Sequence, residues 1–234
     1  MAVTRQEMLD AAVFFEEGRR PSQPLRGHGF LLHGARASGK TSLAFQAAIN
    51  TVQREGERGQ VVVLCQESAF YAKVPVPFTP LGALSPSELG RIEFVYVESW
   101  SAALRELMEL RTLHAVPPLL LIDDDGFEVE TPSARLGRSG QHADVLTSTA
   151  AAACLSYLEN IHDWITRNRR PFSYVLVTNA LPESATRLAL PYAAFPLVSV
   201  WVGASGVVQV TPVPCDPTVI APAYLTWRNG LQLR

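Results

Sequence analysis

Short apolar runs alternate with helical patterns along most of the chain. From Gly29 onward, the apolar runs have the length of buried strands, and they span residues 30–33, 61–65, 92–97, 119–122 and 174–178. Between these runs, apolar residues recur at helical spacing: Leu43, Ala47 and Ala48, then Leu104, Leu107 and Met108, then Leu155, Leu158, Ile161 and Ile165. Strands that alternate with helices form a mainly parallel sheet with helices on its faces. We therefore expect an α/β fold in which each connection is a crossover helix.

The pattern changes after Phe195. Short strand-like segments follow at 197–202, 207–211 and 223–227, and glycines and an Asn229-Gly230 turn signal separate them. We expect C-terminal antiparallel β-hairpins that extend one edge of the sheet. Residues 72–86 and 128–142 lack a periodic apolar face, which predicts surface loops.

The start of the chain carries an apolar stripe at helical spacing. We divide the chain into an N-terminal helical or linker segment, 1–28, and one domain, 29–234. The stripe consists of Met8, Leu9, Ala12 and Val13, with Phe14 and Phe15. Two interpretations are open, docking on a partner subunit or packing on the chain's own core, and we favour the second.

Composition narrows the class of protein. A chain of 234 residues that is 47% hydrophobic can bury the core of one α/β domain. The formal net charge of −2 does not describe a polyanion-binding surface, so a nucleic-acid contact would need local cations such as Arg135 and Arg138. The three cysteines lack metal-ligand spacing. Neither a signal peptide nor a membrane span is evident, which predicts a nuclear or cytosolic protein without membrane contact.

A glycine-rich segment between the first strand and the first helix fits the Walker A pattern. Glycines allow backbone N–H groups to surround phosphate oxygens, and the helix N-terminus adds partial positive charge there. Lys40 would bridge the terminal phosphates of a nucleotide, and the Thr41 hydroxyl would bind Mg²⁺. The expected cofactor-binding residues are Gly34, Ala35, Arg36, Ala37, Ser38, Gly39, Lys40, Thr41 and Ser42.

Carboxylates follow two of the expected strands. Asp123 ends the apolar run 119–122, where a Walker B carboxylate would reach the Mg²⁺. Asp124 and Asp125 either also bind the Mg²⁺ or begin a solvated loop, and we favour the loop. Glu67 follows the strand 61–65 at the carboxyl edge, where parallel sheets place ligands. It is either the base that activates the attacking water or a surface carboxylate.

These residues resemble the RecA-type recombinase family over most of the chain. Residues 66–70 resemble the family's motif of Glu, two small residues and Phe, which favours Glu67 as the catalytic base alongside Lys40. Residues 174–180 resemble its strand that ends in a Thr-Asn-Gln-like sequence, and residues 223–233 resemble its terminal hairpin. The resemblance implies a RecA-like P-loop ATPase core with ATP and Mg²⁺ as cofactors.

Within that family, the pattern is similar to the RecA-like subunit that pairs with a zinc-containing SWIM-domain protein in the Shu complex. The similar stretch lies at 87–110 and includes Leu89, Tyr96 and Ser99. This resemblance implies a nuclear protein of homologous recombination and DNA repair. Its partners would be a SWIM-domain protein or another recombinase paralogue in a hetero-oligomer, a recombinase and single-stranded DNA.

The sequence departs from a full recombinase. The added N-terminal DNA-binding domain and the Phe-x-x-Ala segment for self-polymerisation are not evident, Ala180 replaces the relay glutamine, and the loop 181–192 is short. We therefore expect a weak ATPase that assists recombinase assembly on single-stranded DNA. Two alternatives are a free-standing P-loop enzyme, such as a small-molecule kinase, and an ATP-binding scaffold subunit of another assembly.

Overall fold

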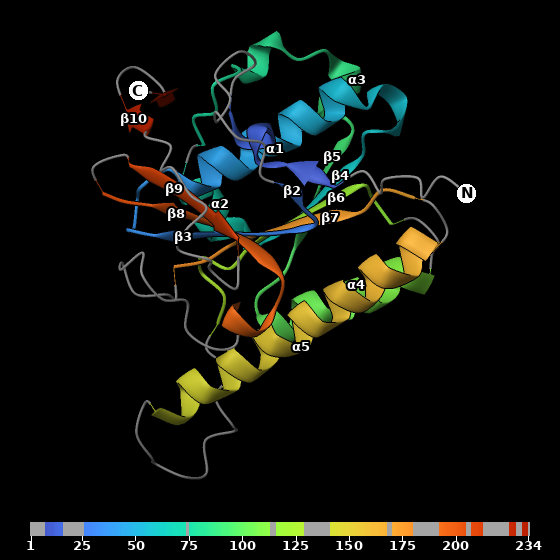
Figure 1. Ribbon diagram of the computed structural model, residues 1–234, viewed down its shortest axis with the longest axis vertical. Coiled ribbons are helices and arrows are strands. Elements are labelled where there is room, and N and C mark those ends of the chain that lie inside the picture. The colour runs from blue at the N-terminus through green and yellow to red at the C-terminus, as the bar shows by residue number, and fades with distance from the viewer. Residues whose placement is uncertain are drawn as a thin grey trace.

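In the described part of the chain, a seven-stranded sheet lies between two layers of helices (Figure 1). The computed structural model describes residues 8–15, 26–73, 75–112, 116–128, 141–167, 170–179, 192–204, 207–212, 225–227 and 231–233. The strands of the sheet are β3 (Gly29–Gly34), β4 (Val61–Cys65), β5 (Ile92–Tyr96), β6 (Leu119–Asp123), β7 (Ser173–Val177), β8 (Leu197–Val202) and β9 (Val208–Pro212). This architecture confirms the predicted α/β class with a mainly parallel sheet.

The order of the strands is β5-β4-β6-β7-β3-β8-β9. All neighbours are parallel except β8 and β9. Strands β3, β4, β6 and β7 are buried along their whole length, as expected of apolar strands covered on both faces. Because β7 lies between β3 and β6, the carboxyl ends of these three strands meet at one edge of the sheet.

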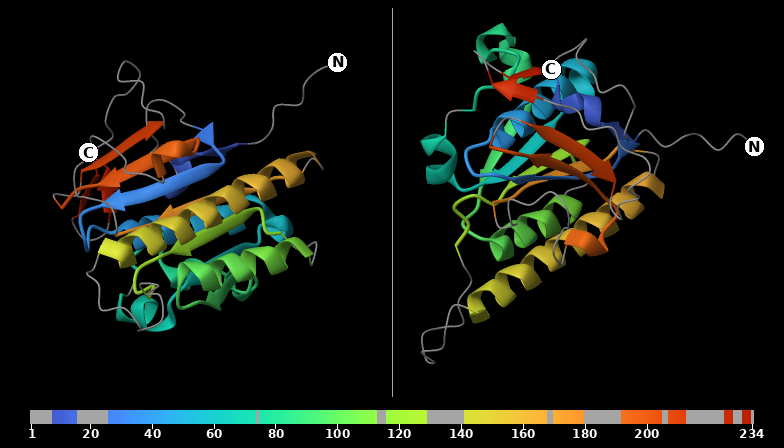
Figure 2. Two further views of the ribbon diagram at one scale, coloured as in Figure 1. Left: turned by 90° about the horizontal axis from the view of Figure 1, so that it is seen from below. Right: turned by 60° about the vertical axis from the view of Figure 1, so that its left-hand side comes forward.

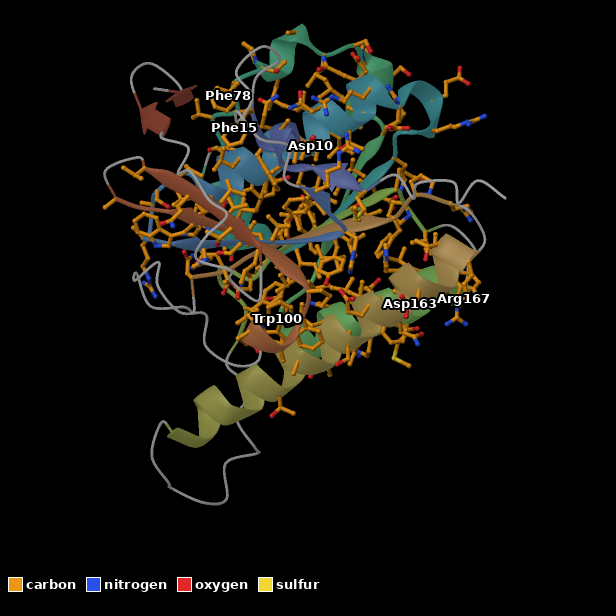
Figure 3. All side chains as sticks on the ribbon, in the orientation of Figure 1. Asp10, Phe15, Phe78, Trp100, Asp163 and Arg167 are labelled. Atoms are coloured by element: carbon orange, nitrogen blue, oxygen red, sulfur yellow. The ribbon has the colours of Figure 1, made fainter. Side chains whose placement is uncertain are left out.

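Helices cover both faces of the sheet (Figure 2), and a hydrophobic core lies between the sheet and each helix layer. Helix α1 (Lys40–Arg54) covers one face, and α4 (Trp100–Thr112) and α5 (Gln141–Arg167) cover the other. Phe30 and Leu32 of β3 pack toward α1, whereas Leu31 packs toward α4 and α5, because successive side chains of a strand point to opposite faces. Figure 3 shows Trp100 below the sheet and Phe15 above it.

The described part of the N-terminal segment packs on α1. Strand β1 (Leu9–Asp10) pairs with β2 (Arg26–Gly27), and the 3-10 helix η1 (Ala11–Phe14) follows β1. Its residues are buried, and Asn50 Nδ2 of α1 donates to the carbonyl oxygens of Val13 (2.7 Å) and Phe15 (3.0 Å). Packing on the chain's own core, which the sequence favoured, is confirmed for this stretch.

The C-terminal prediction was partly wrong. Strand β8 pairs in parallel with β3, so that β9 is the one described strand that adds antiparallel pairing to this sheet. Strands β10 (Leu225–Trp227) and β11 (Leu231–Leu233) form a separate antiparallel pair, and the Asn229-Gly230 turn lies outside the described residues. Strand β8 is buried along most of its length, as expected of a strand with a neighbour on each side.

The two expected loops contain short regular elements. Residues 72–86 include the end of α2 (Glu67–Ala72), the 3-10 helix η3 (Leu81–Ala83) and the first residue of α3 (Pro86–Leu89). Ser85 and Glu88 form a capping box at α3. Helix α5 already begins at Gln141, and residues 129–140 lie outside the described residues. None of the described helices has the length and apolar character that crossing a membrane requires.

Candidate functional site

The glycine-rich loop, residues 34–39, connects β3 to α1 and turns sharply. Gly34, Ala37 and Gly39 have positive φ angles of 116°, 54° and 93°. A Cβ on Gly34 would lie 2.3 Å from the carbonyl oxygen of Val202, so this position requires glycine. The Ala35 amide donates to the same oxygen at 2.9 Å, which fixes the loop to β8. The loop therefore presents the N-terminus of α1, with its partial positive charge, at the edge of the sheet.

Lys40, the first residue of α1, is buried against this loop. Its Nζ donates to the carbonyl oxygens of Gly34 (3.4 Å) and Ala35. Burial lowers the pKa of the ammonium, and the nearby Asp123 carboxylate opposes that change. The ammonium can exchange carbonyl oxygens for phosphate oxygens, which are stronger acceptors.

Thr41 and Asp123 connect the two sequence motifs directly. The Thr41 hydroxyl donates to Asp123 Oδ2 at 2.8 Å, and Asp123 Oδ1 accepts the Asp125 amide at 3.2 Å. Asp123 is buried at the end of β6, and this burial raises the pKa of its carboxyl. A hydroxyl and a carboxylate oxygen at this spacing are the kind of ligands that Mg²⁺ prefers.

Asp124 and Asp125 begin the turn after β6, as the favoured interpretation expected, but their side chains are partly buried and paired rather than solvated. Asp124 is half-buried, its Oδ2 accepts the Thr178 hydroxyl at 2.5 Å, and its Oδ1 accepts the Asn179 amide at 3.3 Å. Burial raises the pKa of Asp124 to about 7. Burial acts in the same direction on Asp125, but the hydrogen bond and charge of Lys73, together with Asn179 and Arg36, outweigh it and lower that pKa. Thr178 and Lys73, which contact Asp124 and Asp125, lie far from these acids in the sequence, so the local sequence pattern could not identify them.

Lys73 is a functional candidate that the motif analysis missed. It follows α2, and its ammonium forms ion pairs with Asp125 Oδ2 and with Asp123 Oδ2, the latter at 3.9 Å. The sequence did contain a signal, because the chain has only two lysines among its 20 Lys and Arg residues. Both lysines, Lys40 and Lys73, line the same cavity.

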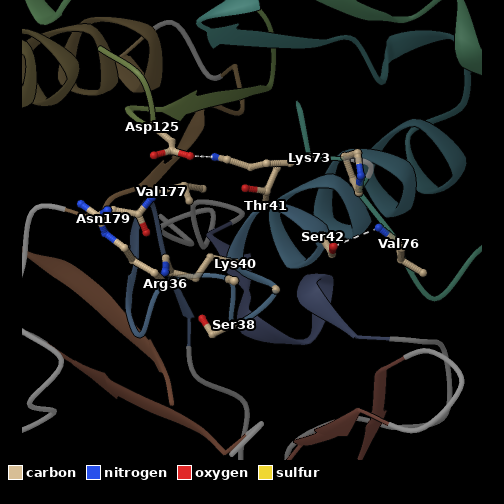
Figure 4. A pocket seen from close by; sticks show the side chains of 13 residues that line it. Arg36, Ser38, Lys40, Thr41, Ser42, Lys73, Val76, Asp125, Val177 and Asn179 are labelled. Carbon is tan, nitrogen blue, oxygen red and sulfur yellow. Dashed lines mark hydrogen bonds and ion pairs between the residues drawn. The ribbon is translucent and has the colours of Figure 1, made fainter. Parts of the chain in front are cut away.

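The cavity has a volume of about 590 Å³, within the range of small-molecule sites (Figure 4). Its lining comes from the loop and the start of α1 (residues 36–42), from Lys73, Pro75 and Val76, and from Asp125, Val177 and Asn179. Ser42 Oγ accepts the Val76 amide at 3.0 Å, which holds the second wall against α1. Of the expected cofactor-binding residues, Arg36 to Ser42 line the cavity, while Gly34 and Ala35 form the base of the loop.

The described lining of the cavity does not include the other predicted site residues. Glu67 is the first residue of α2, at the carboxyl end of β4, and its side chain is exposed. It is not among the described residues that line the cavity. Arg135, Arg138 and Ala180 lie outside the described residues. Among the described side chains, no group of three or more His, Cys, Asp and Glu is arranged to hold a metal ion.

The geometry brings together a buried lysine, a hydroxyl–carboxylate pair and a helix N-terminus at the carboxyl edge of a parallel sheet. Such an arrangement can bind a phosphorylated ligand together with a divalent cation. Comparisons with protein-family models and with curated proteins gave no match for this chain.

Proposed function

We propose that this chain binds ATP with Mg²⁺ in the cavity beside the glycine-rich loop and hydrolyses it slowly. The hydrogen bond from Thr41 to Asp123 Oδ2, 2.8 Å long, carries the proposal. It joins two side chains that lie 82 positions apart in the chain, and both supply oxygen at the N-terminus of α1. This donor set suits a hard divalent cation beside a triphosphate.

The residues at this site suit the phosphates of ATP and the Mg²⁺ that they would bind. The phosphates would lie at the N-terminus of α1, with Lys40 compensating their charge, and Thr41 and Asp123 would hold the metal. Bound Mg²⁺ would neutralise charge on the terminal phosphates. Glu67, at the carboxyl end of β4, is the proposed base that takes a proton from the attacking water.

We extend this proposal to a RecA-like recombinase paralogue that acts in a nuclear hetero-oligomer. It would assist recombinase assembly on single-stranded DNA during homologous recombination and DNA repair, with a SWIM-domain zinc protein or another paralogue as partner. The resemblance of residues 66–70, at the junction of β4 and α2, supports this role. Tyr71 and Tyr96 support a protein partner, because they are 67% and 40% exposed and their hydroxyl oxygens lie 3.2 Å apart.

The direct test replaces Lys40 with Ala and measures ATP binding by titration calorimetry. ATP affinity should fall at least tenfold, about 1.4 kcal/mol or more, because the charge beside the phosphates is lost. Arg54→Ala is the matched control, since it removes a cation from the exposed last turn of the same helix and should leave affinity unchanged. Equal affinity of the Lys40 variant and the wild-type chain would contradict the assignment.

The role in recombination has a separate test. Affinity purification from native cells, followed by identification of stoichiometric partners, should recover a SWIM-domain protein or a recombinase paralogue. Recovery of the chain without either partner, while its ATP binding is intact, would retain the nucleotide site and exclude the recombination role.

A further inference from the structure

Two groups, a hydroxyl and an ammonium, approach the same oxygen atom of Asp123. Oδ2 accepts the Thr41 hydroxyl at 2.8 Å, and the Lys73 ammonium lies 3.9 Å from the same oxygen. The other oxygen, Oδ1, accepts the Asp125 amide, so Oδ2 is the oxygen that faces Thr41 and the Lys73 ammonium. Figure 4 shows the Lys73 side chain reaching across to Asp125, with Thr41 beside it.

The two lysines of the chain contact different partners at this site. Lys40 Nζ donates to loop carbonyl oxygens, whereas Lys73 Nζ reaches the acids after β6. The Lys73 backbone is fixed at the end of α2 by its amide, which donates to the Phe70 carbonyl oxygen at 3.1 Å. Its side chain is 34% exposed, and its four-carbon stem allows the ammonium to turn while the backbone stays in place.

A metal ion and this ammonium would compete. A dication held by Thr41 and Asp123 would approach Oδ2, the oxygen that Lys73 already faces. Like charges at such separation repel strongly in a partly buried site. Asp125 alone then remains as the acidic partner of Lys73, and a phosphate oxygen becomes an alternative partner within the same cavity.

We propose that the Lys73 ammonium holds the cation position between Asp123 and Asp125 when no metal is bound, and that Mg²⁺ displaces it toward the terminal phosphate of the nucleotide. The inference rests on the proposed ATP site and adds a residue to it. Lys73 is a positioning residue that favours a triphosphate over a diphosphate, because only the triphosphate offers the displaced ammonium a third phosphate group.

Amine acylation read by mass spectrometry tests the displacement on the wild-type chain. Because the chain has two lysines, the labelling of each is resolved directly. Lys73 should label about threefold faster with Mg²⁺ and ADP than without ligand, and slowly again with Mg²⁺ and a non-hydrolysable ATP analogue. Lys40, which is 4% exposed, should label slowly throughout. Lys73 labelling that is the same in all three states would overturn the inference.

Variants supply the second test. In Lys73→Gln, the Mg²⁺ concentration for half-maximal ADP binding should fall about threefold or more, and the ratio of ATP to ADP affinity should fall about tenfold. Lys73→Arg keeps the charge and should restore the wild-type Mg²⁺ requirement. An unchanged Mg²⁺ requirement in Lys73→Gln would overturn this inference alone. A wild-type chain that binds no ATP would overturn the proposed function as well.

Discussion

Buried and half-buried polar side chains gather at both ends of the central strands, but their arrangements differ. At the amino end, His28 precedes β3, Tyr174 lies in β7, and Glu159 and His162 belong to α5. The Glu159 carboxylate lies 3.0 Å from His28 Nε2 and accepts the Tyr174 hydroxyl. The rings of His28 and His162 stack with their centroids 3.8 Å apart. One carboxylate thus binds together the start of β3, β7 and α5.

At the carboxyl end, the charged groups border open space. Lys40, Lys73 and Asp125 line a cavity of about 590 Å³, and Asp123 lies beside it, with its Oδ2 3.9 Å from the Lys73 ammonium. Burial lowers the pKa of Lys40 and raises that of Asp123, whereas Lys73 helps to lower the pKa of Asp125. Polar groups that satisfy one another chiefly hold the fold together, whereas charges beside a cavity can accept a ligand. The comparison shows that burial of polar residues alone does not identify a site. The accompanying space and the glycine-rich loop make the difference.

The largest expected effect concerns His33, near the carboxyl end of β3. Burial, and then the charge of Lys40, lower the pKa of His33 from 6.5 to about 4. As pH falls from 6.5 to 4, the unfolded chain binds a proton that the folded chain does not, so folding loses stability. Relative to His33→Gln, the wild-type chain should lose about 3 kcal/mol of unfolding free energy between pH 7 and 4.

Urea denaturation of both proteins across this pH range measures the difference. Comparing wild type with variant removes the contribution of other groups that titrate over the same range. His33→Gln can keep a hydrogen bond to Ser199, whose Oγ lies 2.7 Å from His33 Nε2. Parallel stability profiles would show that the carboxyl end does not hold this histidine neutral.

The second effect tests the catalytic part of the carboxyl end. Glu67→Gln keeps the shape of the side chain but removes the proposed base, so hydrolysis should fall by roughly 10²-fold while ATP binding is preserved. Glu57→Gln is the control, because Glu57 is exposed in the 3-10 helix Gly56–Arg58, which precedes β4. Steady-state phosphate release measures both. Equal turnover in wild type and Glu67→Gln would identify Glu67 as a surface carboxylate.

The third effect tests the structural role of the amino end. Glu159→Gln removes the charged acceptor shared by His28 and Tyr174, which should lower the unfolding free energy by about 2 kcal/mol. ATP affinity should stay within about twofold of wild type, since this cluster lies at the opposite end of β3 and β7. Chemical denaturation and calorimetry give the two readouts. A tenfold loss of ATP affinity would break the distinction between the two ends.

The smallest effect concerns coupling to DNA. In the proposed resemblance to recombinases, Ala180 takes the place of a relay glutamine, and its methyl group can neither donate nor accept a hydrogen bond. Single-stranded DNA should therefore stimulate hydrolysis by the isolated chain less than about tenfold. Rates with and without DNA, for the chain alone and with its partner, test this. Stimulation above that level would point to an autonomous DNA-activated ATPase.

The sequence by itself determined the elements and the loop. Three kinds of feature could be predicted because each depends on neighbouring residues. They are the five strand cores, the glycine-rich turn before Lys40 and the acid that ends β6. The predicted meeting of Thr41 with Asp123 also followed, since the carboxyl ends of parallel strands share one edge.

Only the tertiary structure decided how the remaining charges are used. Asp124 binds Thr178, and Asp125 binds Lys73, across separations of 54 and 52 positions that no local pattern encodes. The same holds for β8, whose parallel pairing with β3 depends on a strand far away in the chain. Local sequence sets backbone conformation and burial through short-range periodicity, whereas the partner of a buried charge is chosen by the packing of distant elements.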